Sequence, residues 1–302
     1  MANSLSNMQR EAFEVFEETL SQAGADILRM GPVLTNDEAQ LTLQTAQSGG
    51  GFTAYTAPGT NVTKDVLSGK VTFTSSPKAK IEKLRWVDLK DNKNLLNDRV
   101  VSMANRAVAD IASIATAGLE SLFSANHPLA GTSAGQAGSS KKYLDTGMGV
   151  GSVSQSNLFT QALSRSSVIG GIETLRNWVS WGDATKLNLG GAGSDLCLVV
   201  GPQNEDLAMQ LVGSAVASSE NQMNYLNGRI KDVIVTPFGD GDDAFLIDRT
   251  ARPVGMWIRE MPTVSVTPDS SQGNLDLIVS CKFIADFFYD VEGAGIIGYN
   301  VA

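Results

Sequence analysis

The longest regular pattern of apolar and polar positions runs from Asn97 to Ala125. Apolar residues recur there at steps of three and four, which places them in one stripe along an α-helix. Asn97 can cap the first turn, and Pro128 ends the helical stretch. At 1.5 Å per residue this helix is about 40 Å long, whereas an average helix has about 11–12 residues. It is either an ordinary buried helix of a large domain or a rigid helix that fixes the positions of distant surfaces relative to one another. The stripe comprises Val100, Ala104, Ala107, Ile111, Ile114, Gly118 and Leu122.

A second amphipathic helix is predicted over residues 6–22. The stretch that follows, Gly31 to Ala46, shows little periodicity. We therefore expect residues 1–48 to form an arm that lies on another surface, and the alternative is a helix packed on its own domain. The apolar positions of the helix are Met8, Phe13, Phe16 and Leu20, and its exposed acids are Glu11, Glu14, Glu17 and Glu18.

Alternation of apolar and polar residues marks the next segment as strand. It covers Val71 to Phe73 and Ile81 to Leu89, with Ser75-Ser76-Pro77 as the interruption. We expect residues 49–92 to form an extended β-hairpin loop. Because an isolated hairpin is only marginally stable in water, this projection is expected to rest on a neighbour.

The second half of the chain is predicted to form a loop, a helix and an α/β unit. Residues 130–155 are a low-complexity loop of small residues, and a further helical stripe follows. The final strong element, Leu275 to Asp290, is expected to return to the long helix. The second stripe comprises Val168, Ile172, Leu175 and Val179, and the expected strands are Leu196–Val200, Val233–Thr236, Ala244–Ile247, Val254–Ile258 and Thr263–Val266.

Charge is unevenly distributed along the chain. The net charge is −9 and the pI about 4.7, yet residues 64–93 carry +4, so the remainder carries −13. Such a basic segment could bind nucleic acid, or it could dock on an acidic copy of the same protein, and the second interpretation explains both halves of the asymmetry. The basic residues of interest are Lys64, Lys70, Lys78, Lys80, Lys83 and Arg85, and the acidic candidates on a neighbour are Glu11, Glu14, Glu17, Glu18, Asp110 and Glu120.

Composition excludes several classes of protein. A hydrophobic content of 42% indicates a globular chain, and no apolar run reaches the roughly 18 residues that span a bilayer. The acidic, amphipathic N-terminus does not resemble a signal peptide. Cys197 and Cys281 lie in apolar, strand-like runs and are expected to be buried thiols, as in a reducing cytoplasm.

Candidate chemistry is sparse. His127 is the only histidine, and no nucleophile elbow accompanies it, so a catalytic triad is not predicted. The glycines at 190, 191 and 193 precede a strand, whereas a dinucleotide-binding fingerprint follows one. Asp240, Asp242 and Asp243 lack the loop length and closing glutamate of a calcium motif and are expected to form a solvated turn. We therefore predict no catalytic residue, no cofactor and no metal site.

Five local strings, in this order and spacing, resemble the major capsid proteins of tailed bacteriophages, most closely the major head subunits of Mu-like phages. The resemblance covers roughly residues 50–292. The strings are Leu122-Phe123-Ser124-Ala125-Asn126-His127-Pro128, Leu198-Val199-Val200-Gly201-Pro202, Asn227-Gly228-Arg229-Ile230, Val233-Ile234-Val235-Thr236-Pro237 and Ala244-Phe245-Leu246-Ile247-Asp248.

The resemblance implies an α+β chain with the Hong Kong 97-like capsid fold. Its parts would be the N-terminal arm, the extended loop, and a peripheral subdomain over residues 93–195 with a spine helix at 97–125. Residues 196–270 would form an α/β axial subdomain around pentamer and hexamer centres, and residues 271–302 the return strand and C-terminal tail. Some family members carry an N-terminal scaffolding domain, and the roughly 50 residues before the loop are too few for one.

Function and partners follow from the same resemblance. A major capsid protein self-assembles through pentamers and hexamers into the icosahedral head that encloses double-stranded DNA, without sequence-specific binding and without a membrane. A separate scaffold, a portal and decoration proteins would be its partners, the virion its location, and the host cytoplasm its place of assembly. The alternatives are an encapsulin-like compartment shell and, in a different class, an α/β enzyme with its site in residues 196–290.

Overall fold

The computed structural model describes residues 2–22, 26–38, 40–46, 68–92, 94–123, 157–178, 186–213, 225–237, 241–269, 276–289 and 295–300. Side chains are described throughout these ranges except at residues 2–6, 21–22, 42–46 and 68–72. The helices are α1 (Ala2–Gln22), α2 (Trp86–Asp91), α3 (Leu95–Leu122), α4 (Arg165–Asn177) and α5 (Glu205–Gly213), with 3₁₀ turns η1 (Asp26–Met30) and η2 (Pro202–Asn204). The strands are β1 (Val33–Thr35), β2 (Leu41–Ala46), β3 (Ser68–Phe73), β4 (Pro77–Leu84), β5 (Leu158–Phe159), β6 (Leu196–Val200), β7 (Ile230–Val235), β8 (Ala244–Asp248), β9 (Val254–Pro268), β10 (Leu277–Tyr289) and β11 (Ile296–Tyr299).

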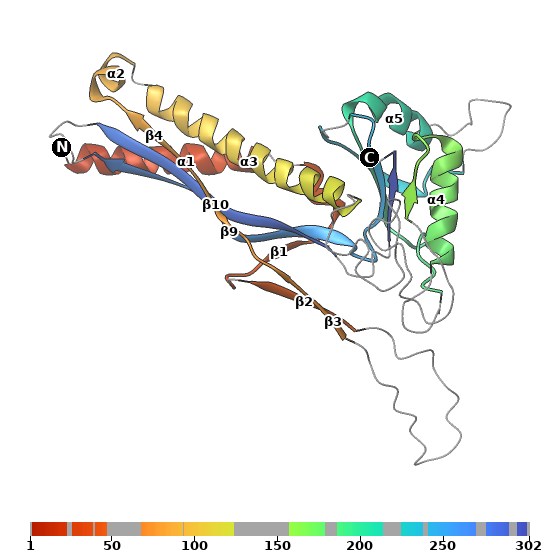
Figure 1. Cartoon of the computed structure of the whole chain (residues 1–302). Coiled ribbons are helices and arrows are strands. Elements are labelled where there is room, and N and C mark those ends of the chain that lie inside the picture. Colours follow the sequence, from red (N-terminus) through yellow and green to blue (C-terminus); the bar gives the residue numbers. More distant parts are fainter. Residues whose placement is uncertain are drawn as a thin grey trace, which may run out of the picture.

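A long, four-stranded sheet in the order β1-β9-β10-β4 forms one half of the molecule (Figure 1). Burial alternates along β10, because successive side chains of a strand point to opposite faces. The buried face carries α1 and α3, and one continuous core joins Phe16 of α1, Ile111 of α3 and Val279 of β10. Among the described residues, those that pack on the opposite face are at one end of the sheet, where Leu41 and Phe73 contact Trp257 and Phe288.

Close packing of α3 on the sheet depends on small residues in its apolar stripe. Gly118 lies against the ring of Phe287, where an added Cβ would be 2.2 Å from Cγ of that ring. Ala104, Ala107 and Ala115 lie in the same buried stripe. The helix can therefore approach β10 more closely than a helix with large side chains could.

The other half of the molecule is a five-stranded sheet in the order β5-β11-β8-β6-β7. Strands β6 and β8 are buried at every position, as expected of strands covered on both faces. Leu198 and Leu246 face a core shared with α4 and α5, whereas Val199 and Phe245 face the core that contains α3. The ring of Phe123, just after α3, lies 5.7 Å from the ring of Phe245 and links the two halves.

The expected hairpin over residues 49–92 is wrong in its pairing. Strand β3 pairs with β2, which lies in the stretch from Gly31 to Ala46 where no element was expected, and β4 pairs with β10. Ser75, Ser76 and Pro77 are where the chain leaves one sheet and enters another. A two-stranded ribbon does project from the body, but β2 and β3 form it (Figure 1).

Two further strands are grouped differently from the expectation. The runs at Val254–Ile258 and Thr263–Val266 form the single strand β9, which pairs with β10 in the long sheet rather than with β6 or β8. The C-terminal strand β11 joins the five-stranded sheet by pairing with β8. Strand length accounts for the placement of β9, because β9 and β10 pair from Val254 to Pro268, a longer span than any strand of the five-stranded sheet offers.

Helix positions were predicted better than strand partners. The long helix runs from Leu95 to Leu122, within a few residues of the expected bounds, and β10 returns to it as predicted. Asn97 does not cap it, because the residue before the helix is Asn94, and the amide of Asn97 instead donates to Glu11 (3.2 Å). Helix α1 packs on its own chain through Ala12 and Phe16, which was the alternative to an arm that lies on another surface.

Candidate functional site

Strand β4, which carries three of the four basic candidates whose side chains are described, is an edge strand of the long sheet. Lys78 and Lys80 point toward α3, and Ile81 and Lys83 point to the opposite face. Arg85 is exposed and directly precedes α2. Lys64 lies outside the described residues, and of Lys70 only the backbone, in β3, is described.

Lys83 is bound within its own chain. Its ammonium group lies 2.6 Å from Asp269 and 3.3 Å from Asp276, two residues at the ends of β9 and β10. The hydrogen bond to Asp269 raises the pKa of Lys83, and the backbone N–H of Trp86, donating to Asp276, lowers the pKa of that carboxyl. Lys83 therefore binds the end of β4 to the connection between β9 and β10.

The acidic candidates occupy the two helices on the sheet. Glu11 accepts from Asn97, Glu14 lies 3.7 Å from Arg10, and Asp110 lies 2.9 Å from Arg106 one turn away. Such exposed pairs contribute little to stability and leave the carboxylates accessible to another partner. Glu17 and Glu18 are exposed on α1, and Glu120 is half-buried on α3.

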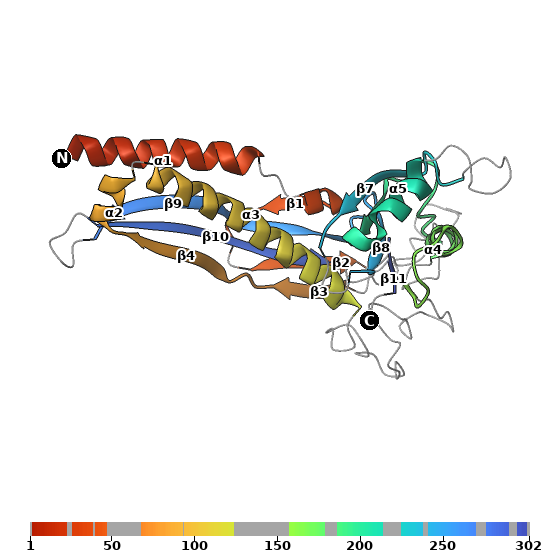
Figure 2. The ribbon, with the colours of Figure 1, turned by 90° about the horizontal axis from the view of Figure 1, so that it is seen from above.

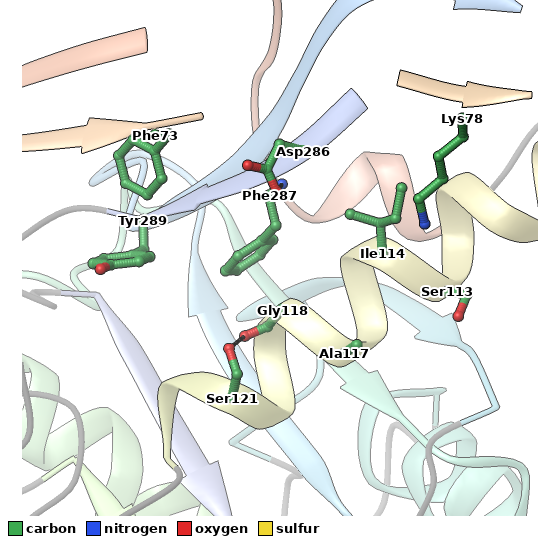
Figure 3. A pocket seen from close by; sticks show the side chains of 10 residues that line it. All are labelled: Phe73, Lys78, Ser113, Ile114, Ala117, Gly118, Ser121, Asp286, Phe287 and Tyr289. Atoms are coloured by element: carbon green, nitrogen blue, oxygen red, sulfur yellow. Dashed lines mark hydrogen bonds between the residues drawn. The ribbon is translucent and has the colours of Figure 1, made fainter. Parts of the chain in front are cut away.

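A hollow of about 480 Å³ lies between α3, the start of β4 and the end of β10 (Figure 3). The rings of Phe73 and Tyr289 meet edge to face, 5.0 Å apart, on one side, and Lys78 reaches toward α3 on the other. Burial raises the pKa of Asp286 in its wall. Ser121 donates back to the Gly118 carbonyl (2.7 Å), so the hydroxyl is engaged in its own helix. These groups form an apolar depression with a charged rim and not a nucleophile with its base.

Arg249 organises the junction between the two halves. Its guanidinium group binds Asp195 through two atoms, at 2.9 and 2.8 Å, and also reaches Asp232 (3.2 Å) and the carbonyl of Arg29 (3.1 Å). The hydrogen bonds that Arg249 donates to Asp195 lower the pKa of this carboxyl group. Sequence reasoning missed this cluster because its members come from four separate elements and no local spacing relates them.

Asp242 and Asp243 are not as solvated as we expected. Asp242 accepts from the Asn300 amide at 2.8 Å, and Asp243, directly before β8, is buried. Asp240 and His127 lie outside the described residues. Within the described ranges no group of three or more His, Cys, Asp or Glu residues could hold a metal ion, and no described helix is long and apolar enough to cross a membrane.

Both thiols are buried, as predicted, and burial raises their pKa values, to about 12 for Cys197 and about 11 for Cys281. Since the thiolate is the reactive form, we expect neither cysteine to react with a thiol reagent at pH 8 in the folded protein. Both should react after unfolding in urea. Release of chromophore from a disulfide reagent measures this, and prompt labelling of the native chain would contradict it.

Comparison with solved structures shows the same fold in several capsids. The chain aligns with the asymmetric unit of the mature capsid of bacteriophage PhiM1 with a TM-score of 0.53 and 12% identity, covering 89% of this chain and 83% of that one. For the capsid of a native GTA particle the TM-score is 0.52 and the identity 12%, with 91% and 90% covered. For a virus-like particle from Pyrococcus furiosus the TM-score is 0.52 and the identity 9%, with 96% and 98% covered.

The α+β, Hong Kong 97-like fold predicted from the sequence is thus confirmed. A search of curated proteins found no match, and the nearer resemblance to Mu-like phages stays a prediction. The family and the fold indicate a structural protein rather than an enzyme. The family model for phage capsid protein matches residues 71–294, well over half of the sequence, and the chain therefore belongs to the phage capsid protein family.

Proposed function

We propose that this chain is the major capsid protein of a tailed bacteriophage. Copies assemble through pentamers and hexamers into an icosahedral head that encloses double-stranded DNA. Assembly takes place in the host cytoplasm with a separate scaffold, a portal and decoration proteins, and the product is the virion. Support comes from the family match and from the fold shared with the PhiM1 and GTA capsids.

The observation that carries the proposal is the ribbon formed by β2 and β3. Its described base is a small cluster in which Leu41 and Phe73 meet Trp257 and Phe288. A two-stranded ribbon with so little core is marginal alone and gains stability by lying on another surface. A neighbouring copy in a shell supplies that surface.

We assign the subdomains in these terms. The long sheet with α1 and α3 is the peripheral subdomain, the β2–β3 ribbon is the base of the extended loop, and the five-stranded sheet with α4 and α5 is the axial subdomain near pentamer and hexamer centres. The acidic balance of the chain suits an inner wall along which packed DNA slides, because phosphate binding needs clustered cations.

The contacts between copies are proposed to be electrostatic. Basic residues of one copy, drawn from Lys64, Lys70, Lys78, Lys80 and Arg85, meet carboxylates on α1 and α3 of a neighbour. Lys83 is removed from this set because Asp269 and Asp276 already hold it. An encapsulin-like compartment shell is the second candidate, favoured by the nearly full-length likeness to the Pyrococcus furiosus virus-like particle.

Negative-stain electron microscopy of the purified protein, after light scattering on a sizing column, tests the proposal. We expect closed icosahedral particles, or free pentamers and hexamers where the scaffold is missing. Particle diameter then separates a phage head from a small compartment. A strict monomer that forms no particles even when co-expressed with the neighbouring phage genes would overturn the shell assignment.

A further inference from the structure

The two long margins of the four-stranded sheet differ in cover. On one side α1 closes the sheet, and the Gln9 amide donates to the Val266 carbonyl of β9 at 2.6 Å. On the other side β4 is the edge strand, and within the described residues no element pairs with its outer edge. Figure 2 shows α1 and β4 along opposite long sides of this half. An open edge strand of eight residues is a site where another chain can attach.

The β4 margin presents positive charge on the face toward α3. Lys80 has a partner in Glu82 at 2.8 Å, and its side chain remains 46% exposed. Lys78 is exposed and makes no ion pair with any described residue. Ile81, 68% exposed, places a large apolar side chain on the other face of the same strand.

The outer side of α1 presents the complementary groups. At 3.6 residues per turn, Ala12 and Phe16 point into the core, so Glu14 and Glu17 lie on the outer side of the helix and Phe13 lies on its flank next to Glu17. All three are exposed, and Phe13 is 43% exposed although it is a large apolar residue. An exposed phenyl ring beside two carboxylates is an unusual surface for a helix whose apolar stripe is already buried.

A row of contacts across the sheet sets the relative level of the two margins. Gln9 bonds to Val266, Val266 pairs with Val279, and Val279 pairs with Glu82, so Gln9 of α1 is level with Glu82 of β4. Toward the five-stranded sheet, residue numbers rise along α1 and fall along β4. Distances from this row can therefore be compared directly on the two sides.

The charges on the two margins match in spacing. At about 3.3 Å per strand residue, Lys80 and Lys78 lie about 7 and 13 Å from the row. At about 1.5 Å per helical residue, Glu14 and Glu17 lie about 7.5 and 12 Å from it. Phe13 falls about 6 Å along, between the levels of Ile81 and Lys80 on the same scales.

We propose that neighbouring copies pack side by side, with the β4 margin of one against α1 of the next. Lys80 then lies opposite Glu14 of the neighbouring copy, Lys78 opposite Glu17, and Phe13 packs beside Ile81. This inference rests on the proposed shell function and adds the partner surface and its register. Because the two margins are different surfaces, the contact is heterologous and forms a ring where the rotation between copies closes.

Cysteine pairing tests the register. In the variant with Phe13→Cys and Ile81→Cys, oxidation should link copies into a ladder of covalent oligomers, without interference from the buried native cysteines. The matched control combines Phe13→Cys with Val87→Cys, which is equally accessible but lies at the far end of the sheet. Equal ladders from the two variants, or no ladder from the first in assembled particles, would overturn the register.

Charge reversal tests the energetics. Lys78→Glu with Lys80→Glu should lower the yield of particles at least tenfold, as should Glu14→Lys with Glu17→Lys, and the fourfold swap should restore it. The control, Lys90→Glu with Lys186→Glu, changes the net charge by the same amount as the lysine pair, at exposed positions in α2 and before β6. Particles at wild-type yield from both double variants, or a fourfold swap that restores nothing, would overturn the contact. Wild-type particles in the same preparations establish the shell function separately.

Discussion

Replacing Arg249 with methionine is expected to lower the free energy of unfolding of the unassembled subunit by about 2–3 kcal/mol. Methionine keeps much of the apolar stem but removes every hydrogen bond to Asp195, Asp232 and the Arg29 carbonyl. Asp195 would then keep only the distant Lys231 as a cationic partner, whereas Asp232 still lies 3.1 Å from Arg29. Because Asp195 is still 39% exposed, the cost lies below that of a fully buried pair.

The effect of Arg249→Met should depend on pH in a defined direction. Arg249 lowers the pKa of Asp195 in the folded state. The pair therefore contributes its full stability above the unfolded-state pKa of about 3.9, and this stability is lost as the pH falls through the folded-state pKa. The difference between wild type and variant should therefore be full at pH 7 and shrink below about pH 4. Urea unfolding at several pH values measures both quantities.

Lys231→Met is the matched control for this experiment. Lys231 lies 4.0 Å from Asp195 and is half exposed, so its loss should cost less than about 1 kcal/mol. If Arg249→Met costs no more than Lys231→Met, the network does not hold the two halves together.

Gly118→Val is expected to destabilise the subunit by about 2–3 kcal/mol, although valine ordinarily suits a helix better than glycine. The first added carbon would lie 2.2 Å from Cγ and 2.7 Å from Cβ of Phe287, which are the inflexible atoms of that side chain. Helix α3 must then move away from β10, and the close packing along its length is lost. The midpoint of urea unfolding measures the change.

Two further variants isolate the cause. In a Phe287→Ala background Gly118→Val should cost much less, because the clash has been removed, and this non-additivity shows that the two residues act together. Gly213→Val places the same side chain in open space at the end of α5 and should change stability by less than about 0.5 kcal/mol. Equal costs at positions 118 and 213 would show that glycine at 118 does not serve packing.

Periodicity predicted the elements that are defined by local pattern, and only those. Helix α3 and strands β6 and β8 follow from spacing and apolar runs, because the residues that form them are neighbours in the sequence. Strand β4 was recognised but given the wrong partner, since its true partner β10 follows about 200 residues later. Alternation of apolar and polar residues predicts a strand but does not indicate which strand will pair with it.

The candidate site was predictable to a similar extent. The charge asymmetry that singled out Lys78 and Lys80 is a property of composition, and the structure places both on an open edge. Lys83 belongs to the same basic run but is held by Asp269 and Asp276, which only the fold brings near. The fit of Gly118 to Phe287 likewise depends on a contact between distant parts of the chain.

The β2–β3 ribbon is attached to the long sheet at both of its margins. Its first strand follows β1, at one edge, and its second strand leads directly into β4, at the other. Between these points the ribbon base crosses the face opposite the helices, where Trp257 donates to the Asn36 carbonyl (3.3 Å). A pull that a neighbour exerts on the ribbon is therefore divided between two edge strands and directed along them. A force parallel to the strands loads many inter-strand hydrogen bonds at once, so they resist it together and do not open one by one. The ribbon can therefore transmit tension across the width of the subunit.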